Sequence, residues 1–159
     1  MNHVIRIADW HDVSAVMPVM EDAFDPLYGE AWSETQLSAL LLGPGNWMLV
    51  LEVEERICGF AVARSVLDEA ELMLIAVPQK MRGRGYGRAL LDKVIVECRR
   101  RNVRRIYLEV RSDNENAVML YESAGFRPVG RRSGYYRGKD AVLRDATTMV
   151  LDLVNDSLR

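Results

Sequence analysis

The sequence predicts an α/β fold, with a mixed, mostly antiparallel central sheet flanked by helices. Three observations predict it. Strand-like and helical segments follow the order βααβββαβαββ, three of the strands succeed one another across short turns, and a glycine-rich turn leads from the third of them into a long amphipathic helix. The chain has 159 residues, 49% hydrophobic and 28% charged, which is enough apolar material for one compact domain over residues 1–159.

The start of the chain is predicted to hold a strand, a helix and a loop. Residues 4–7 have the composition of a short strand. Asp9 or Asp12 can cap a helix that runs to about residue 24, because valines and methionines recur there at helical spacing. The segment DPLYGEAW, residues 25–32, carries the Pro, Gly and Asp of a loop.

A second helix and three strands come next. Ser33, with Gln36 three residues later, is the capping-box pattern of a helix that ends near residue 43. Strand-like segments then occupy residues 47–52, 57–65 and 71–77. The turns between them are short, so these strands are expected to form an antiparallel meander.

The second half of the chain alternates helices with strands. A long helix is predicted from about residue 85 to 101, with apolar side chains on one face, and a strand at residues 106–110 follows it. Residues 114–124 form a further helix that Gly125 ends. Strands near residues 127–132 and 146–153 complete the sheet.

Composition excludes several classes of protein. A net charge of −2 and a pI of about 5.7 give no support to DNA binding, which usually needs a basic surface. Cys58 and Cys98 are far apart and lack CxxC spacing, so neither a disulfide framework nor a metal site is expected. The N-terminus has no apolar signal region, and no apolar run is long enough to span a bilayer. We therefore expect a cytoplasmic protein without a membrane partner.

The glycine-rich turn is the first candidate site. Glycines and arginines alternate at the start of the long helix: Arg82, Gly83, Arg84, Gly85, Gly87 and Arg88. The free N–H groups and the dipole at the start of a helix favour an anion, and glycines let a ligand approach the backbone closely. A pyrophosphate is therefore the expected ligand. The spacing is neither the dinucleotide fingerprint nor a P-loop. A flexible turn before an ordinary helix is the alternative.

The pattern Arg82-x-x-Gly85-x-Gly87 resembles the acetyl-CoA signature R/Q-x-x-G-x-G/A of the GNAT superfamily of N-acetyltransferases. The order of elements is similar too, over nearly the whole chain. Within the superfamily the chain resembles the bacterial ribosomal-protein-alanine N-acetyltransferases, through the segments AWSETQL, LDEAELMLIAV, RGRGYGRALL, IYLEVRSDNENAVMLYESAGF and GYYRGKDAVLRDATTMVL. The resemblance implies acetyl-CoA as co-substrate, without a metal.

The resemblance also implies two catalytic residues. Glu109, on the strand at residues 106–110, would be the general base, acting directly or through water, and Tyr121 would protonate the departing thiolate. The residues by themselves leave other interpretations open. Glu109 alternates with Arg111 on one face of its strand and could simply pair with it, and Tyr121 could be a core aromatic beside Phe126.

Further residues are expected to hold the cofactor. Asn114 is predicted to cap the helix at residues 114–124, and the resemblance adds a contact to the pantetheine or phosphate arm. The resemblance implies that the backbone around Val77 pairs with pantetheine and that the Val77 N–H polarises the thioester carbonyl. Leu74 stands where the subfamily often has Asn, a departure from its pattern. The expected contacts are Ile75, Ala76, Val77, Arg82, Gly83, Arg84, Gly85, Tyr86, Gly87, Arg88, Asn114 and Tyr121.

Two segments are expected to surround the acceptor amine. Tyr135 and Tyr136 are predicted to lie in the loop between the last two strands, where the resemblance implies a wall of the acceptor groove. Trp32 and its loop would form the opposite wall. Ordinary loop packing is the alternative for the two tyrosines.

Three hypotheses follow for the function. The first is acetylation of the N-terminal alanine of a small-subunit ribosomal protein, which would be the protein partner. The second is acetylation of a small-molecule amine such as a polyamine, amino acid or antibiotic, for which acidic residues are available: Glu21, Asp22, Asp25 and Glu30. The third is an acyl-CoA-binding module without turnover.

Overall fold

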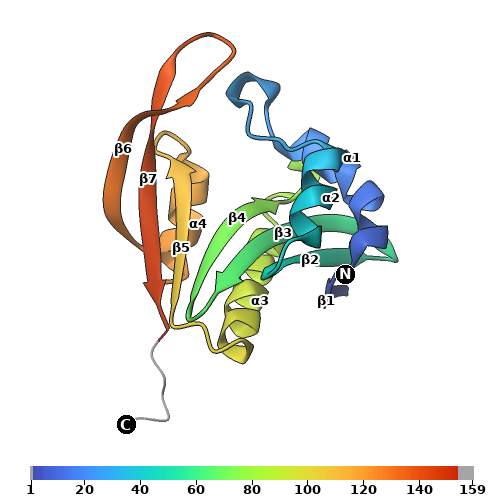
Figure 1. Cartoon of the computed structure of the whole chain (residues 1–159). Coiled ribbons are helices and arrows are strands. Elements are labelled where there is room, and N and C mark those ends of the chain that lie inside the picture. Colours follow the sequence, from blue (N-terminus) through green and yellow to red (C-terminus); the bar gives the residue numbers. More distant parts are fainter. Residues whose placement is uncertain (1, 154–159) are drawn as a thin grey trace.

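The computed structural model describes residues 2–153 (Figure 1). Seven strands form one sheet in the order β1-β2-β3-β4-β5-β7-β6. They are β1 (His3–Ile7), β2 (Asn46–Val53), β3 (Arg56–Val66), β4 (Glu69–Ala76), β5 (Arg105–Arg111), β6 (Arg127–Arg137) and β7 (Leu143–Asp152). The α-helices are α1 (Val13–Ala23), α2 (Glu34–Leu42), α3 (Tyr86–Arg100) and α4 (Glu115–Ser123). This order, and the mixed, mostly antiparallel sheet, confirm the predicted fold class.

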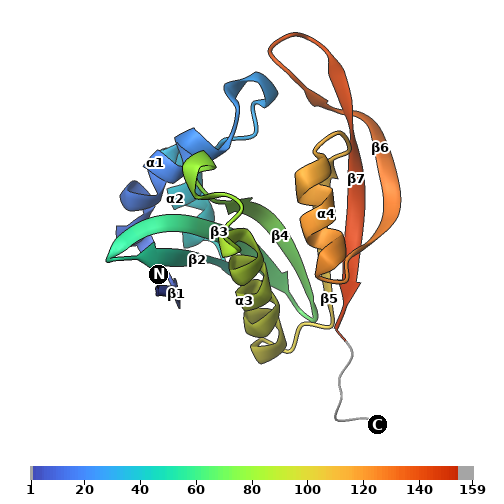
Figure 2. The ribbon, with the colours of Figure 1, turned by 180° about the vertical axis from the view of Figure 1, so that it is seen from behind.

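Helices cover both faces of the sheet, and each pair of helices encloses its own core. Figure 2 shows α3 and α4 on one face, with α1 and α2 on the other. One apolar cluster lies between the sheet and helices α3 and α4, and it includes Leu90, Leu91 and Tyr121. A second cluster lies between the sheet and helices α1 and α2, and it includes Val16 and Leu37. Each fully buried leucine contributes roughly 1.5–3 kcal/mol, so the sheet between the two clusters is a stable platform. None of the helices among residues 2–153 is long and apolar enough to cross a membrane.

The predicted helix starts are confirmed, with one refinement. The Gln36 backbone N–H donates to Ser33 Oγ at 3.1 Å, and the Ser33 N–H donates to Gln36 Oε1 at 2.8 Å. Asp9 caps a short 3-10 turn, Trp10–Asp12, and Asp12 bonds back to the Asp9 N–H at 3.0 Å. The two candidate caps, Asp9 and Asp12, therefore form one capping box on the 3-10 turn that precedes α1.

The β4 and β5 strands separate after a short parallel contact. They pair only from Glu69↔Arg105 to Glu71↔Tyr107. Beyond that point β4 stays with β3 up to Ala76, while β5 stays with β7 up to Arg111. The sheet therefore opens into a V, which Figure 1 shows between the green β4 and the yellow β5.

A bulge in β4 changes which face its side chains point to. Ala63 pairs with Leu72 and Val62 pairs with Leu74, so Met73 is an extra residue. As a result Leu72 packs in the α3 and α4 cluster, while Leu74 packs in the α1 and α2 cluster. Ile75 then faces the cluster on the α3 and α4 side.

The last hairpin is longer than predicted. Tyr135 and Tyr136 lie within β6, so their placement in a connecting loop was wrong. Gly134, next to the two tyrosines, has a φ angle of 61°. The ladder between β6 and β7 shifts register between Arg132 and Tyr136, and this irregularity accommodates the glycine without ending the strand. The strand then resumes and carries both tyrosines.

Candidate active site

The glycine-rich turn has the geometry of an open cradle. Gly83 and Gly85 have φ angles of 76° and 84°, where a side chain is strained. A Cβ at either position would meet no atom within 4 Å, so the backbone faces open space. Gly85 is the N-cap of α3 and supplies no side-chain cap, so the first N–H groups of the helix can receive an anion.

The three arginines around the turn have different surroundings. The Arg82 guanidinium donates to the Ala23 carbonyl at 2.7 Å and fastens the turn to the end of α1. Arg88 pairs with Asp92 at 2.9 Å and donates to the Ser123 carbonyl at 3.1 Å, linking α3 to α4. Arg84 is exposed and has no ion pair within the described part of the chain. Of the three, Arg84 is therefore the side chain most available to a phosphate.

Two other predicted cofactor residues have structural roles. Tyr86 is buried beneath the turn, with its ring edge-on to His3 at 5.7 Å, so only its backbone faces the cradle. Asn114 caps α4, as predicted, and accepts from the Ala117 N–H at 3.3 Å. Gly87 faces α4, where a Cβ would lie 3.7 Å from Leu120.

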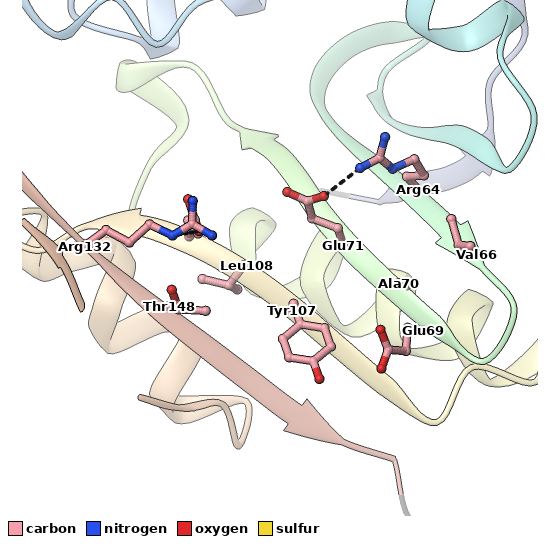
Figure 3. Close-up of a pocket in the computed structure, with 10 residues that line it drawn as sticks. Arg64, Val66, Glu69, Ala70, Glu71, Tyr107, Leu108, Arg132 and Thr148 are labelled. Carbon is pink, nitrogen blue, oxygen red and sulfur yellow. Dashed lines mark hydrogen bonds and ion pairs between the residues drawn. The ribbon is translucent and has the colours of Figure 1, made fainter. Parts of the chain in front are cut away.

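Glu109 lies on β5 beyond the point where β4 and β5 separate, with a side chain 19% exposed. Its partner is Arg132 of β6, with Nε 3.0 Å from Oε1, and the suggested pairing with Arg111 is wrong. The Glu109 charge and a hydrogen bond to it raise the pKa of Tyr135 above its usual range. A cavity of about 340 Å³ beside Glu109 is lined by residues of β3, β4, β5, β6 and β7 (Figure 3).

Tyr121 is a core aromatic beside Phe126, which is one of the two interpretations of its position. Its ring is buried on α4, 5.9 Å from the ring of Phe126. Burial, followed by the nearby Tyr136 and Glu30, raises the pKa of the Tyr121 phenol above its ordinary value. The same kind of surroundings raise the pKa of Tyr136 to about 12, mainly through burial and then through Glu30 and Glu109. Both phenols therefore keep their protons and can donate hydrogen bonds at neutral pH.

An ionic network that the sequence did not reveal holds the loop at residues 25–32. Arg111 is buried and pairs with both Glu30 and Asp113, and its guanidinium lies 3.4 Å from the centre of the Tyr28 ring. Burial raises the pKa of Glu30, an effect that Arg111 opposes. Glu30 and Arg111 are 81 residues apart in the chain, so no local pattern connects them.

The same loop touches the tip of the last hairpin. The Lys139 N–H donates to the Leu27 carbonyl at 2.8 Å, and Arg144 lies 4.9 Å from the Tyr28 ring centre. The segment predicted as a loop contains a 3-10 turn, Pro26–Tyr28, that Asp25 caps. Trp32 is half-buried against the α1 and α2 cluster. The two segments expected to surround the acceptor are thus joined at the open end of the V, as Figure 1 shows.

Replacing Arg111 by methionine is expected to destabilise the fold by about 2 kcal/mol, because Glu30 would remain partly buried without its cation. For a chain of this size the Tm should fall by about 4–8 °C in a thermal melt. The double variant Arg111→Met/Glu30→Gln should recover part of the loss, since it removes the unpaired charge. Equal stability of the single and double variants would contradict this account.

Comparisons with known proteins agree with the fold. Residues 13–126 match the Acetyltransferase (GNAT) family. The [ribosomal protein bS18]-alanine N-acetyltransferase of Haemophilus ducreyi is 35% identical over 124 residues, which are 77% of this chain and 83% of that protein. The Escherichia coli K12 protein of the same name is 42% identical over 98 residues, 62% of this chain. The crystal structure of the ribosomal-protein-S18-alanine N-acetyltransferase from Escherichia coli has a TM-score of 0.86 at 32% identity, covering 99% of both chains.

The sequence alignments do not all reach the full length of the relatives. The matched stretches span 60% of the Salmonella typhimurium relative and 66% of the Escherichia coli K12 relative. Family membership rests instead on the match over residues 13–126, the Haemophilus ducreyi relative and the fold. By these three findings, the chain belongs to the Acetyltransferase (GNAT) family.

Proposed function

We propose that the chain is a single-domain, cytoplasmic N-acetyltransferase that transfers acetyl from acetyl-CoA to the N-terminal alanine of a small-subunit ribosomal protein. The opening between β4 and β5 carries this proposal, because it combines a glycine cradle with a strand carboxylate and a buried phenol. The acceptor is proposed from the names of the Escherichia coli and Haemophilus ducreyi relatives.

Acetyl-CoA fits the residues that surround the opening. Within the described residues, β4 has no strand partner on its β5 side after Glu71, so the backbone of Ile75, Ala76 and Val77 can pair with a pantetheine amide. The cradle at Gly83 and Gly85 has room for the pyrophosphate. When bound, the co-substrate supplies the acetyl thioester.

The chain's own groups would then divide the chemistry between them. The Val77 N–H would polarise the thioester carbonyl, and Glu109 would take a proton from the amine, directly or through water. The amine nitrogen forms a bond to the carbonyl carbon, and the carbon–sulfur bond breaks. The neutral phenol of Tyr121 would donate a hydrogen bond to the departing sulfur. Tyr135 and Tyr136 of β6, opposite Trp32, would enclose the acceptor.

Most of the acidic residues that could have bound a polycationic acceptor make contacts within the chain. Asp22 accepts from the Gln79 N–H at 2.7 Å, and Asp25 accepts from the Leu27 N–H at 2.9 Å. Glu30 pairs with Arg111. These contacts leave few carboxylates for a polyamine and favour an acceptor with one reacting amine.

The direct test is to incubate the purified protein with acetyl-CoA and a short peptide copying the N-terminus of ribosomal protein bS18. We expect the peptide to gain the mass of one acetyl group on its α-amine, with release of a stoichiometric amount of thiol. The same peptide with a blocked N-terminus is the control. Acetylation of free polyamines or amino acids, and none of the peptide, would overturn the proposed acceptor.

Replacing Gly85 by alanine is expected to weaken acetyl-CoA binding about tenfold, because a side chain at φ 84° strains the cradle by roughly 1–2 kcal/mol. Calorimetric titration with acetyl-CoA measures this. Gly29→Ala is a matched control, since Gly29 also has a positive φ, 64°, and open space around its Cβ position, but lies outside the turn. Equal losses in both variants would argue against the turn as the donor site. NAD should bind to neither protein.

A further inference from the structure

Glu109 faces groups from three different strands. Arg132 and Tyr135 approach it from β6, and Glu71 of β4 lines the same cavity as Glu109 and Arg132. Tyr107, on the same strand as Glu109, lines the cavity with them. Glu71 is itself paired with Arg64, 3.3 Å away. Among residues 2–153, Arg132 is thus the one cation within ion-pair distance of Glu109.

The two partners of this ion pair differ in exposure. The Arg132 side chain is 60% exposed, whereas that of Glu109 is 19% exposed. The Arg132 guanidinium lies 5.2 Å from the ring centre of Tyr135, at the point where the β6 and β7 ladder shifts register. Figure 3 shows it reaching from β6 over the cavity, with Glu71 on the opposite wall. Arg132 therefore sits on the solvent side of Glu109 and can swing away without disturbing the core.

An ion pair with an exposed arginine is weak, roughly 0.2–1 kcal/mol, which corresponds to a factor of about 1.4 to 5 in an equilibrium constant. The pair of Arg111 with Glu30 could not open so easily, because the Arg111 side chain is only 9% exposed. An acceptor amine arrives at neutral pH mainly as an ammonium ion, and it needs the same carboxylate. The guanidinium and the ammonium must then compete for Glu109.

We infer that Arg132 is a displaceable counter-ion of Glu109, a positioning residue whose place the ammonium group of the acceptor takes as it enters. This inference rests on the proposed function, in which Glu109 receives the acceptor amine. In the empty site Arg132 holds the carboxylate in place.

The test compares two peptides on the protein saturated with coenzyme A, which cannot react. One is the alanine peptide and the other is the same peptide lacking its α-amino group. In Arg132→Gln, the alanine peptide should bind about 1.4- to fivefold more tightly than in wild type, because no guanidinium competes, and the desamino peptide should bind unchanged. Arg132→Lys should restore the wild-type affinity, and the gain should vanish in Arg132→Gln/Glu109→Gln.

Arg131→Gln is the matched control. Arg131 is the neighbouring residue on β6, has a side chain 67% exposed, and pairs with Asp145 rather than Glu109. It should leave the binding of both peptides unchanged. If Arg132→Gln weakens both peptides alike, or alters neither, the inference is overturned, because a purely structural role would not distinguish the amine.

A second measurement tests the displacement of Arg132 without using the ribosomal-protein peptide. Alaninamide is titrated into the protein while the Arg132 Nε–H signal is followed by NMR. Displacement predicts a shift of that signal in wild type and none in Glu109→Gln. A wild-type protein that fails to acetylate the alanine peptide would overturn the proposed function, whereas an unmoved Arg132 signal would overturn the displacement.

Discussion

Replacement of Glu109 by glutamine is expected to lower kcat about 10³-fold, the usual size of a general-base contribution. Glutamine keeps the shape of the side chain and its place beside Arg132, but it cannot accept a proton from the amine. Acetyl-CoA binding should be unchanged, because Glu109 lies on β5, away from the glycine cradle. Steady-state kinetics with the alanine peptide, together with titration of acetyl-CoA, measure the two effects.

Glu71→Gln is the appropriate comparison for this variant. Glu71 lines the same cavity, but it pairs with Arg64 and precedes the opening of the sheet. The Glu71→Gln variant should lower kcat by less than tenfold. If the two glutamine variants lose the same activity, the cavity needs negative charge in general, and Glu109 has no special part in proton transfer.

The second large effect is expected for Tyr121→Phe, which should reduce kcat about 10²-fold, as for the loss of one donor to a developing negative charge. The ring packs against Phe126 and stays in place, so stability should change little. Because burial raises the pKa of Tyr121, the phenol remains protonated throughout the working range. The loss should therefore be the same at every pH between 6 and 9.

This pH independence separates a hydrogen-bond donor from a titrating acid. Profiles of kcat against pH for wild type and Tyr121→Phe should run parallel, without movement of either limb. Tyr107→Phe serves as a control, since its hydroxyl accepts from Arg105 at 3.3 Å at the closed end of the V. A deficit that disappears at high pH would contradict the role given to Tyr121.

Local patterns predicted most of the secondary structure. The Ser33 and Gln36 capping box and the Asn114 cap each depend on residues within one helical turn, so the sequence contains the whole interaction. The positive φ values of Gly83 and Gly85 likewise follow from glycine at a helix start. Such features are visible without knowing what the rest of the chain does.

The partners of the charged residues could not be predicted in the same way. Arg111 alternates with Glu109 on β5, which made an ion pair between them plausible. In the structure Arg111 pairs with Glu30 of the loop at residues 25–32, and Glu109 pairs with Arg132 of β6. Arg82 and Arg88 were assigned to the cofactor, but both also hold helices together through backbone carbonyls. These contacts depend on sheet order and on the loop at residues 25–32, which only the assembled fold defines.

The extra residue in β4 has a consequence for which changes this protein tolerates. Side chains of a strand alternate between faces, so Met73 advances the phase of that alternation by one step. Deleting it would restore a regular ladder in which Leu72 and Leu74 still point to their own clusters, but the local bend and extra twist of the bulge would be lost. Substitutions at Met73 by other apolar residues should thus be mild, whereas loss of a single position there should straighten β4 just beyond Glu71, where it leaves β5. The extra residue thus determines the shape of β4 at the opening more than the direction of any one side chain.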